Sequence, residues 1–238
     1  QESASTGDIK VNGHINDGQM TLKANELGTE FEDTIWVKSS KKWTLKADDE
    51  DSQVLSFDIN GESKNGEETE VQVVVKAMYS KFGSSSYEGK FYIQTAEGTA
   101  VPITVKAMAE VGVYANERTR QDETECVSLN FTDTIQKGVF MTEFYVESNI
   151  RWTLGGLPDW IESASSWNEG AEVTNVLSSR KIDKKRHHVS LRVKSDKVST
   201  EGKTGTISLL DVKGETLKKV SVTFAGVGSG YLTHTLSF

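Results

Sequence analysis

One stretch of this chain occurs twice, and the repeat constrains the fold more than any other feature. Residues 35–45 (IWVKSSKKWTL) align with residues 144–154 (FYVESNIRWTL) at an offset of 109 residues, and Val, Ser, Trp, Thr and Leu are identical at matched places. The similarity resumes near the end of each repeat, where residues 89–93 parallel residues 205–209. A repeat of this length in a chain of 238 residues predicts one structural unit used twice, with a core in each copy.

Within each repeat, apolar residues recur at every second position. This period of two is typical of strands with one buried face. The segments between the strands are rich in turn-forming residues, as in 61–66, 83–89 and 199–205, and short strands between such turns favour a sandwich or a barrel over alternating strands and helices. The alternation is clearest in three runs: Val71, Val73 and Val75; Val189, Leu191 and Val193; Val220, Val222 and Phe224.

These signals predict an all-β chain in three parts. Residues 1–17 are expected to form a flexible N-terminal tether, residues 18–110 a first β-sandwich, and residues 111–238 a second β-sandwich with a C-terminal tail. The tail, residues 226–238, begins with a glycine-rich stretch and ends with an apolar segment. Both an added strand and a docking peptide are open for that segment.

Charge and hydropathy exclude some classes of function. The net charge is −8, whereas a nucleic-acid-binding protein needs a concentrated basic face. Nor does any apolar run approach the roughly 20 residues that span a bilayer. The single cysteine, Cys126, cannot form a disulfide within the chain, and it lies just before an alternating strand, so we expect a structural residue.

The start of the chain bears on where the protein works. The sequence begins at Gln1, without a methionine, and continues with small and polar residues. This start is expected for a mature exported protein at the cell surface or in the periplasm, with a lipid anchor upstream of Gln1 as one option. A chain cut at an arbitrary boundary would look the same.

The second repeat carries a longer pattern. It consists of Val-x-Ser-x-x-x-Trp ending at Trp152, then Leu-Pro-Asp-Trp-Ile-Glu, a long charged loop, a Val-x-Leu-x-Val strand, a glycine-rich turn and two closing strands. This pattern resembles the BACON family, the Bacteroidetes-associated carbohydrate-binding often N-terminal domains, over about residues 125–226 and more weakly over 20–109. The first repeat departs from it, because no second tryptophan follows Trp43. The resemblance implies two tandem immunoglobulin-like antiparallel β-sandwiches in an exported protein of glycan acquisition, acting as a binding module or as a spacer.

The aromatic residues of the repeat fall on two faces. Trp43 and Trp152 share the parity of the buried positions, so they are expected to fill the core. Trp36 and its repeat partner Tyr145 have the opposite parity and are expected to point away from the core. Either they pack against neighbouring groups, or they contact a ligand or partner.

Three further aromatic residues stand near turns or loops. Trp160 follows Pro158-Asp159 and is expected to pack in the core or at its rim. Trp167 and Tyr87 each lie in polar, loop-type sequence. Because loops at the end of a sandwich often carry recognition, these two are candidates for contact with a glycan or a protein.

Two charged runs are candidates for binding sites. Residues 48–51 (DDED) lack the spacing and the glycine of a calcium loop, and a solvated acidic turn is expected there. The basic run Lys181, Lys184, Lys185, Arg186, His187 and His188 is read as an exposed loop, with contact to an anionic sugar as the alternative. No third metal ligand can be identified beside the paired histidines, and neither a metal nor a cofactor is expected.

Together these features favour an exported, non-catalytic accessory protein, since no catalytic motif occurs in the sequence. The expected partner is a polysaccharide, a glycoprotein glycan or another cell-surface protein. The ligand-binding candidates are Trp36, Tyr145, Tyr87 and Trp167. The alternatives are a structural spacer that presents a partner domain and, less favoured, an enzyme fragment with a site between the two domains.

Overall fold

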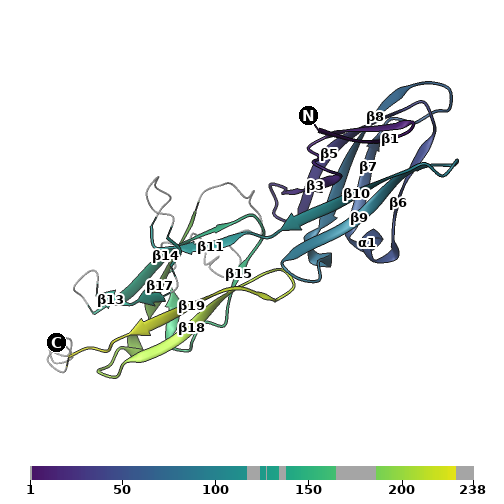
Figure 1. Ribbon diagram of the computed structural model, residues 1–238. Coiled ribbons are helices and arrows are strands. Elements are labelled where there is room, and N and C mark those ends of the chain that lie inside the picture. The colour runs from purple at the N-terminus through teal and green to yellow at the C-terminus, as the bar shows by residue number, and fades with distance from the viewer. Residues whose placement is uncertain (1, 117–123, 127, 134–137, 165–185, 229–238) are drawn as a thin grey trace. The chain divides into compact units, whose positions relative to one another are not determined.

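The computed structural model divides into two compact units, Gln1–Ala109 (unit 1) and Glu110–Phe238 (unit 2) (Figure 1). The structure describes residues 2–116, 124–126, 128–133, 138–164 and 186–228.

Unit 1 consists of two sheets. The first has the strand order β1 (Glu2–Thr6), β2 (Ile9–Gly13), β5 (Glu30–Ser39), β8 (Thr69–Met78) and β7 (Leu55–Asn60), and the short β4 (Lys23–Ala24) also pairs with β5. The second has the order β3 (Gln19–Thr21), β10 (Ala100–Met108), β9 (Ser86–Thr95) and β6 (Trp43–Ala47). A short helix α1 (Asp49–Val54) connects β6 to β7, and a 3-10 turn, η1 (Tyr79–Lys81), follows β8.

Unit 2 repeats this arrangement. Its first sheet has the order β11 (Val111–Tyr114), β14 (Phe140–Ser148), β17 (His187–Val193) and β16 (Ile161–Ser163), with β13 (Thr132–Asp133) beside β14. Its second sheet has the order β12 (Ser128–Asn130), β19 (Thr216–Phe224), β18 (Lys203–Leu210) and β15 (Thr153–Gly155). A 3-10 turn, η3 (Ser195–Lys197), follows β17.

The strand order in both units is that of an immunoglobulin-like sandwich. The main strands of the described residues are, in chain order, β2, β5, β6, β7, β8, β9 and β10 in unit 1 and β11, β14, β15, β16, β17, β18 and β19 in unit 2. In each unit the first sheet joins the first, second, fifth and fourth of these strands, and the second sheet joins the third, sixth and seventh. The chain changes sheets early, so that β3 lies parallel to β10 and β12 lies parallel to β19, while the other pairs are antiparallel. The predicted fold class, two tandem immunoglobulin-like β-sandwiches, is confirmed.

The predicted N-terminal tether, residues 1–17, is wrong. Residues 2–6 and 9–13 form β1 and β2, which pair through a two-residue turn that contains Gly7 at φ 52°. β2 in turn pairs with β5, and Ile9 and Val11 are fully buried. β2 forms because the alternation Ile9-x-Val11 presents two branched side chains to the core. This alternation spans only three residues beside the polar start of the chain, so it is a weak strand signal in the sequence.

The motif Val-x-Ser-x-x-x-Trp has the same structure in both units. The serine ends the second main strand, and its hydroxyl oxygen accepts a hydrogen bond from the backbone N–H two residues later, at 3.0 Å for Ser39 and 3.1 Å for Ser148. This contact tightens the turn into the third main strand, which places the tryptophan in the core. The prediction that Trp43 and Trp152 are buried at matching positions is confirmed, with 6% and 1% of their surfaces exposed.

Trp160 is also a core residue, as predicted. It is buried in unit 2, where its ring meets the ring of Phe131 edge to face, with 5.5 Å between the ring centroids.

Candidate surface for ligand contact

Four side chains form a row across the outward face of the first sheet of unit 1. Trp36 on β5 lies opposite Asn12 on β2 and Gln72 on β8, and Gln72 lies opposite Asn60 on β7. The amide of Asn60 donates a hydrogen bond to Oε1 of Gln72 at 3.2 Å. We call these four residues the Trp36 row. The row places one large ring between amide groups that can donate and accept hydrogen bonds.

The ring of Trp36 is half-buried on this face. Within the part of the chain that the structure describes, its indole N–H makes no hydrogen bond to the protein. The indole nitrogen is not fully buried. An indole N–H that remains accessible beside an apolar ring can serve both stacking and hydrogen bonding. The geometry therefore leaves Trp36 available to a ligand.

Two lysines beside the Trp36 row are held in ion pairs. Nζ of Lys38 lies 3.9 Å from Glu68, and Nζ of Lys76 lies 2.7 Å from Asp58. The hydrogen bond to Asp58 raises the pKa of the Lys76 ammonium. Lys10 and Glu70 lie opposite Lys38 on the neighbouring strands, so the row has charges of both signs around it, while its own polar groups are mainly amides.

Tyr145, the counterpart of Trp36 in unit 2, has a different environment. It lies opposite Tyr114 on β11 and His188 on β17. Its ring packs on the His188 ring, with 5.0 Å between the centroids and 31° between the planes. The guanidinium of Arg186 lies 3.4 Å from the centre of the Tyr114 ring and donates to Glu147 at 3.2 Å. Tyr145 thus belongs to a packed cluster, as expected if an outward ring is covered by its neighbours.

Tyr87 does not lie in a loop, contrary to the sequence prediction. It belongs to β9, its ring stacks on Phe82 with 5.3 Å between centroids, and its hydroxyl donates to Asp51 at 2.6 Å. Burial first, and then the hydrogen bond to Asp51, raise the pKa of the Tyr87 hydroxyl. The glycines on both sides of the polar run conceal a strand whose alternation becomes visible only from Phe91 onward. The other loop candidate, Trp167, lies outside the described residues.

The acidic run 48–51 does not form a plain solvated turn. Residues 49–51 open the helix α1, and the carboxylate of Asp51 accepts hydrogen bonds from the Tyr87 hydroxyl and from the backbone N–H of Lys90 at 3.2 Å. Asp51 thereby fixes α1 against β9. In the described ranges no group of three or more His, Cys, Asp or Glu side chains could hold a metal ion.

The basic run before Val189 is not an exposed loop where the structure describes it. The side chain of Arg186 is only 1% exposed, and His187 and His188 belong to β17. Arg186 is buried because Glu147, the ring of Tyr114 and the backbone oxygen of Asn116 all satisfy its guanidinium. Lys181, Lys184 and Lys185 lie outside the described residues.

Cys126 is half-buried and packs against the core of unit 2. Its thiol donates to the backbone oxygen of Ser128 at 3.1 Å. This position agrees with a structural role, and slow labelling of the native thiol stays a prediction.

Sequence reasoning found Trp36 but missed its neighbours in the row. The alternation of apolar residues in their strands indicates that Gln72 and Asn60 point outward. Asn12 was missed because residues 1–17 were expected to form a tether. The missing signal was the register between strands, since a shift of one residue would exchange the two faces of a strand.

These features define the class of protein: a chain of two tandem immunoglobulin-like sandwiches, of which the first carries an aromatic ring between amides on an open sheet face. Among the described residues no helix is long and apolar enough to cross a membrane.

No family model matches the sequence, and no curated protein matches it either. Among solved structures, a protein of unknown function from Porphyromonas gingivalis W83 is 6% identical at a TM-score of 0.29, covering 92% of this chain and 99% of that one. The sialic acid binding region of a Streptococcus sanguinis SK1 adhesin is 9% identical at 0.28, covering 93% and 78%. The titin immunoglobulin tandem A164-A165 is 10% identical at 0.30, covering 94% and 100%. Likeness at this level transfers no ligand to the chain.

Proposed function

We propose that this chain is an exported, non-catalytic accessory protein that binds glycan through the Trp36 row of unit 1. The observation that carries the proposal is the placement of Trp36 between Asn12 and Gln72 on an outward sheet face, with its indole N–H free of protein partners in the described ranges. The same proposal includes the resemblance to the BACON family and a role for this chain in glycan acquisition at the cell surface or in the periplasm.

The physical support is the match between this surface and a sugar ring. A pyranose offers an apolar face of C–H groups, which can stack on an aromatic ring, and a rim of hydroxyls, which pair with amides because each can donate and accept. The sheet holds Trp36 and Gln72 rigidly in register, so little conformational entropy is lost on binding. The face is open and shallow, and we expect dissociation constants in the millimolar to high micromolar range.

The matched positions in the two units provide the test. The full chain is titrated by calorimetry with soluble xylan, mannan and mixed-linkage β-glucan, and the same titrations are made with Trp36→Ala and Tyr145→Ala. We expect binding to at least one neutral glycan, weakened about tenfold by Trp36→Ala, since a stacking ring is lost. Tyr145→Ala should leave the affinity unchanged.

Two results would reject the proposal. If none of the three glycans binds, the spacer alternative gains support, because a spacer requires no accessible ring. If binding survives Trp36→Ala at full strength, the glycan lies on another surface.

A further inference from the structure

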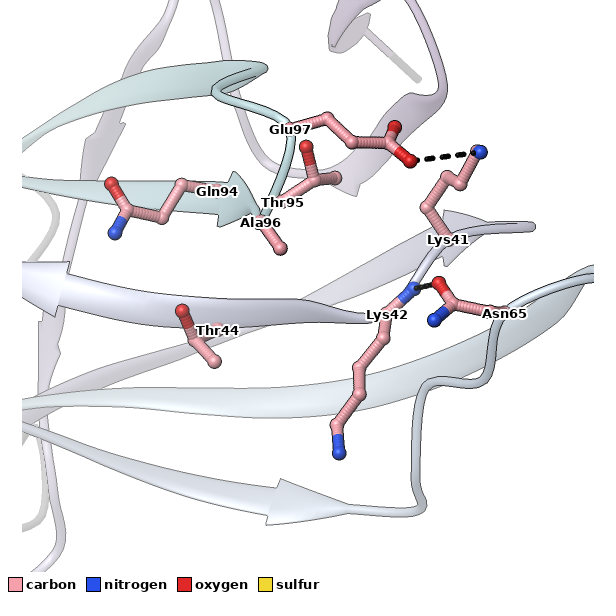
Figure 2. A pocket seen from close by; sticks show the side chains of 8 residues that line it. All are labelled: Lys41, Lys42, Thr44, Asn65, Gln94, Thr95, Ala96 and Glu97. Atoms are coloured by element: carbon pink, nitrogen blue, oxygen red, sulfur yellow. Dashed lines mark hydrogen bonds and ion pairs between the residues drawn. The ribbon is translucent and has the colours of Figure 1, made fainter.

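A polar groove of about 360 Å³ lies at one end of unit 1 (Figure 2). It is formed where the turn between β5 and β6, the loop between β7 and β8 and the turn after β9 meet. The lining side chains that matter here are Lys41, Lys42, Thr44, Asn65, Gln94 and Glu97. We call this surface the Lys42 groove.

Backbone and side-chain contacts fix the walls of the groove. The backbone N–H of Lys42 donates to Oδ1 of Asn65 at 2.9 Å, and the N–H of Gly66 donates to the oxygen of Ser40 at 2.9 Å. Ser63, in the same loop, accepts a hydrogen bond from the backbone N–H of Trp43 at 3.1 Å. The loop between β7 and β8 is thereby tied to the turn before β6, so the groove is formed before any ligand arrives.

The charges in the groove leave one positive charge uncompensated. Nζ of Lys41 lies 3.2 Å from Glu97, and Figure 2 shows this pair at one side of the groove. The ammonium of Lys42 has no ion pair or hydrogen bond to any described residue. Glu62, Glu67 and Glu68 belong to the neighbouring loop, but they do not line the groove.

The remaining polar groups include one amide that is left to donate and two groups that can either donate or accept. Because Oδ1 of Asn65 already accepts the Lys42 N–H, the amide nitrogen of Asn65 is left to donate outward. Gln94 and Thr44 face each other across β9 and β6 and, in the described part of the chain, neither side chain is hydrogen-bonded to the protein. An ammonium group together with amide and hydroxyl donors is a set that recognises an oxyanion.

Among the described residues, the matching end of unit 2 keeps a cation and a hydroxyl, Arg151 and Thr153, but differs from unit 1 at three other places. The place of Lys41 is taken by Ile150, which is fully buried, and the place of Gln94 by Leu210. Glu97 is replaced by Lys213, whose Nζ lies 3.7 Å from Asp211 and 3.6 Å from Glu215. The Gln94 amide and the pairing of Lys41 with Glu97 are therefore features of unit 1 that the described part of unit 2 does not repeat.

We infer that the Lys42 groove binds a sugar residue that carries an oxyanion, a carboxylate or a sulfate. The Lys42 ammonium and the Asn65 amide nitrogen hold the oxyanion, and Gln94 and Thr44 bind the ring hydroxyls. That the anion belongs to a sugar rests on the proposed function, whereas the preference for an oxyanion follows from the groove itself.

The test uses amide chemical shifts of the full ¹⁵N-labelled chain. It is titrated with trigalacturonate, with the fully methyl-esterified trigalacturonate, which has the same rings without charge, and with a sulfated galactose trisaccharide. Saturable shifts are expected at Lys42, the Asn65 side chain and Gln94 with at least one charged trisaccharide and not with the ester. The two charged trisaccharides distinguish carboxylate from sulfate as the source of the oxyanion.

Lys42→Gln should weaken this binding about tenfold, because a charge-assisted contact is lost. Arg151→Gln, at the matching place in unit 2, is the control and should have no effect. Equal shifts with the ester, full affinity in Lys42→Gln, or no saturable shift with either charged trisaccharide would each overturn the inference.

The two sites can be separated by testing each variant in both the calorimetric and the chemical-shift titrations. Trp36→Ala should leave the shifts in the Lys42 groove intact, and Lys42→Gln should leave the binding of neutral glycan intact. Failure of the charged trisaccharides alongside normal neutral binding rejects the groove only, and the reverse result rejects the Trp36 row only.

Discussion

Units 1 and 2 have the same strand order, the same serine turn and the same buried tryptophan, yet their outward faces differ. In unit 1 Trp36 stands between two amides, whereas in unit 2 Tyr145 packs on His188 beside the buried guanidinium of Arg186. At one end of unit 1, Lys41 and Glu97 line a polar groove. Unit 2 has the buried Ile150 and the ion-paired Lys213 at these two places. Core positions of a repeat are held by packing, while surface positions diverge freely, so function is better sought in the differences than in the matches.

The largest expected effect concerns what the two units share. Trp43→Ala and Trp152→Ala should each lower the free energy of unfolding by about 3 to 5 kcal/mol, since each change empties a large buried site. Urea denaturation of each variant beside the parent chain measures the loss. An unchanged midpoint in either variant would mean that the repeated tryptophan is not part of the core in that unit.

The next effect should separate the two outward faces. Glu147→Gln leaves the Arg186 guanidinium, which is 1% exposed, without its carboxylate partner, and about 2 to 3 kcal/mol of stability should be lost. Lys38→Gln, at the matching place in unit 1, breaks only the exposed pair with Glu68 and should cost less than about 0.5 kcal/mol. Equal losses in the two variants would remove the distinction between a packed face and an open one.

A smaller contrast is expected at the turn before the last strand. In unit 2 Oδ1 of Asp211 accepts the backbone N–H groups of Lys213 and Glu215 at 2.8 and 2.9 Å. In unit 1 the hydroxyl of Thr95, at the matching position, is buried and has no partner among the described residues.

Asp211→Ala should therefore cost about 1 to 2 kcal/mol, whereas Thr95→Val should be neutral or stabilise unit 1 by up to about 1 kcal/mol. Thermal denaturation of both variants provides the measurement. A clear loss of stability in Thr95→Val would show that its hydroxyl is hydrogen-bonded in solution.

The smallest effect is a pH dependence confined to unit 1. The pKa of the Tyr87 hydroxyl is raised by burial and by Asp51, whereas unit 2 has Lys203 at this place. A raised pKa means that the folded state holds the proton more tightly, so this contribution is complete below the ordinary tyrosine pKa of about 10 and is lost as the pH rises above it.

Tyr87→Phe should cost about 1 kcal/mol at neutral pH and flatten the decline in stability above pH 10. Tyr92→Phe, on the same strand, is the control. Denaturation series at several alkaline pH values give both slopes, and identical slopes in the parent chain and in Tyr87→Phe would contradict the assignment.

The alternation of apolar residues was sufficient to predict all-β units, as a sandwich or a barrel, because strands with one buried face repeat with a period of two. The parity of Trp43 and Trp152 predicted their burial for the same reason. Position along a strand is a local property, and the sequence expresses it directly. The immunoglobulin-like form of the sandwich was implied by the family resemblance.

The site was predicted only in part, because its neighbours come from strands far apart in the chain. Nothing in the sequence around Trp36 indicates that Asn12 and Gln72 lie opposite it, since register is set by the whole sheet. Arg186 was misplaced for a related reason. Its burial depends on Glu147 and Tyr114, which belong to two other strands, and a run of basic residues without known partners resembles solvated sequence.

The parallel pairing of β3 with β10 and of β12 with β19 has a mechanical consequence. When tension acts along the chain, the start of β3 is drawn in one direction and the end of β10 in the other, so the strands must slide past each other and their hydrogen bonds are strained together. In the antiparallel hairpin of β1 and β2 the same tension opens one bond after another. Each sandwich therefore resists stretching through the pairing of its early and last strands, and within unit 1 the pairing of β1 with β2 yields first.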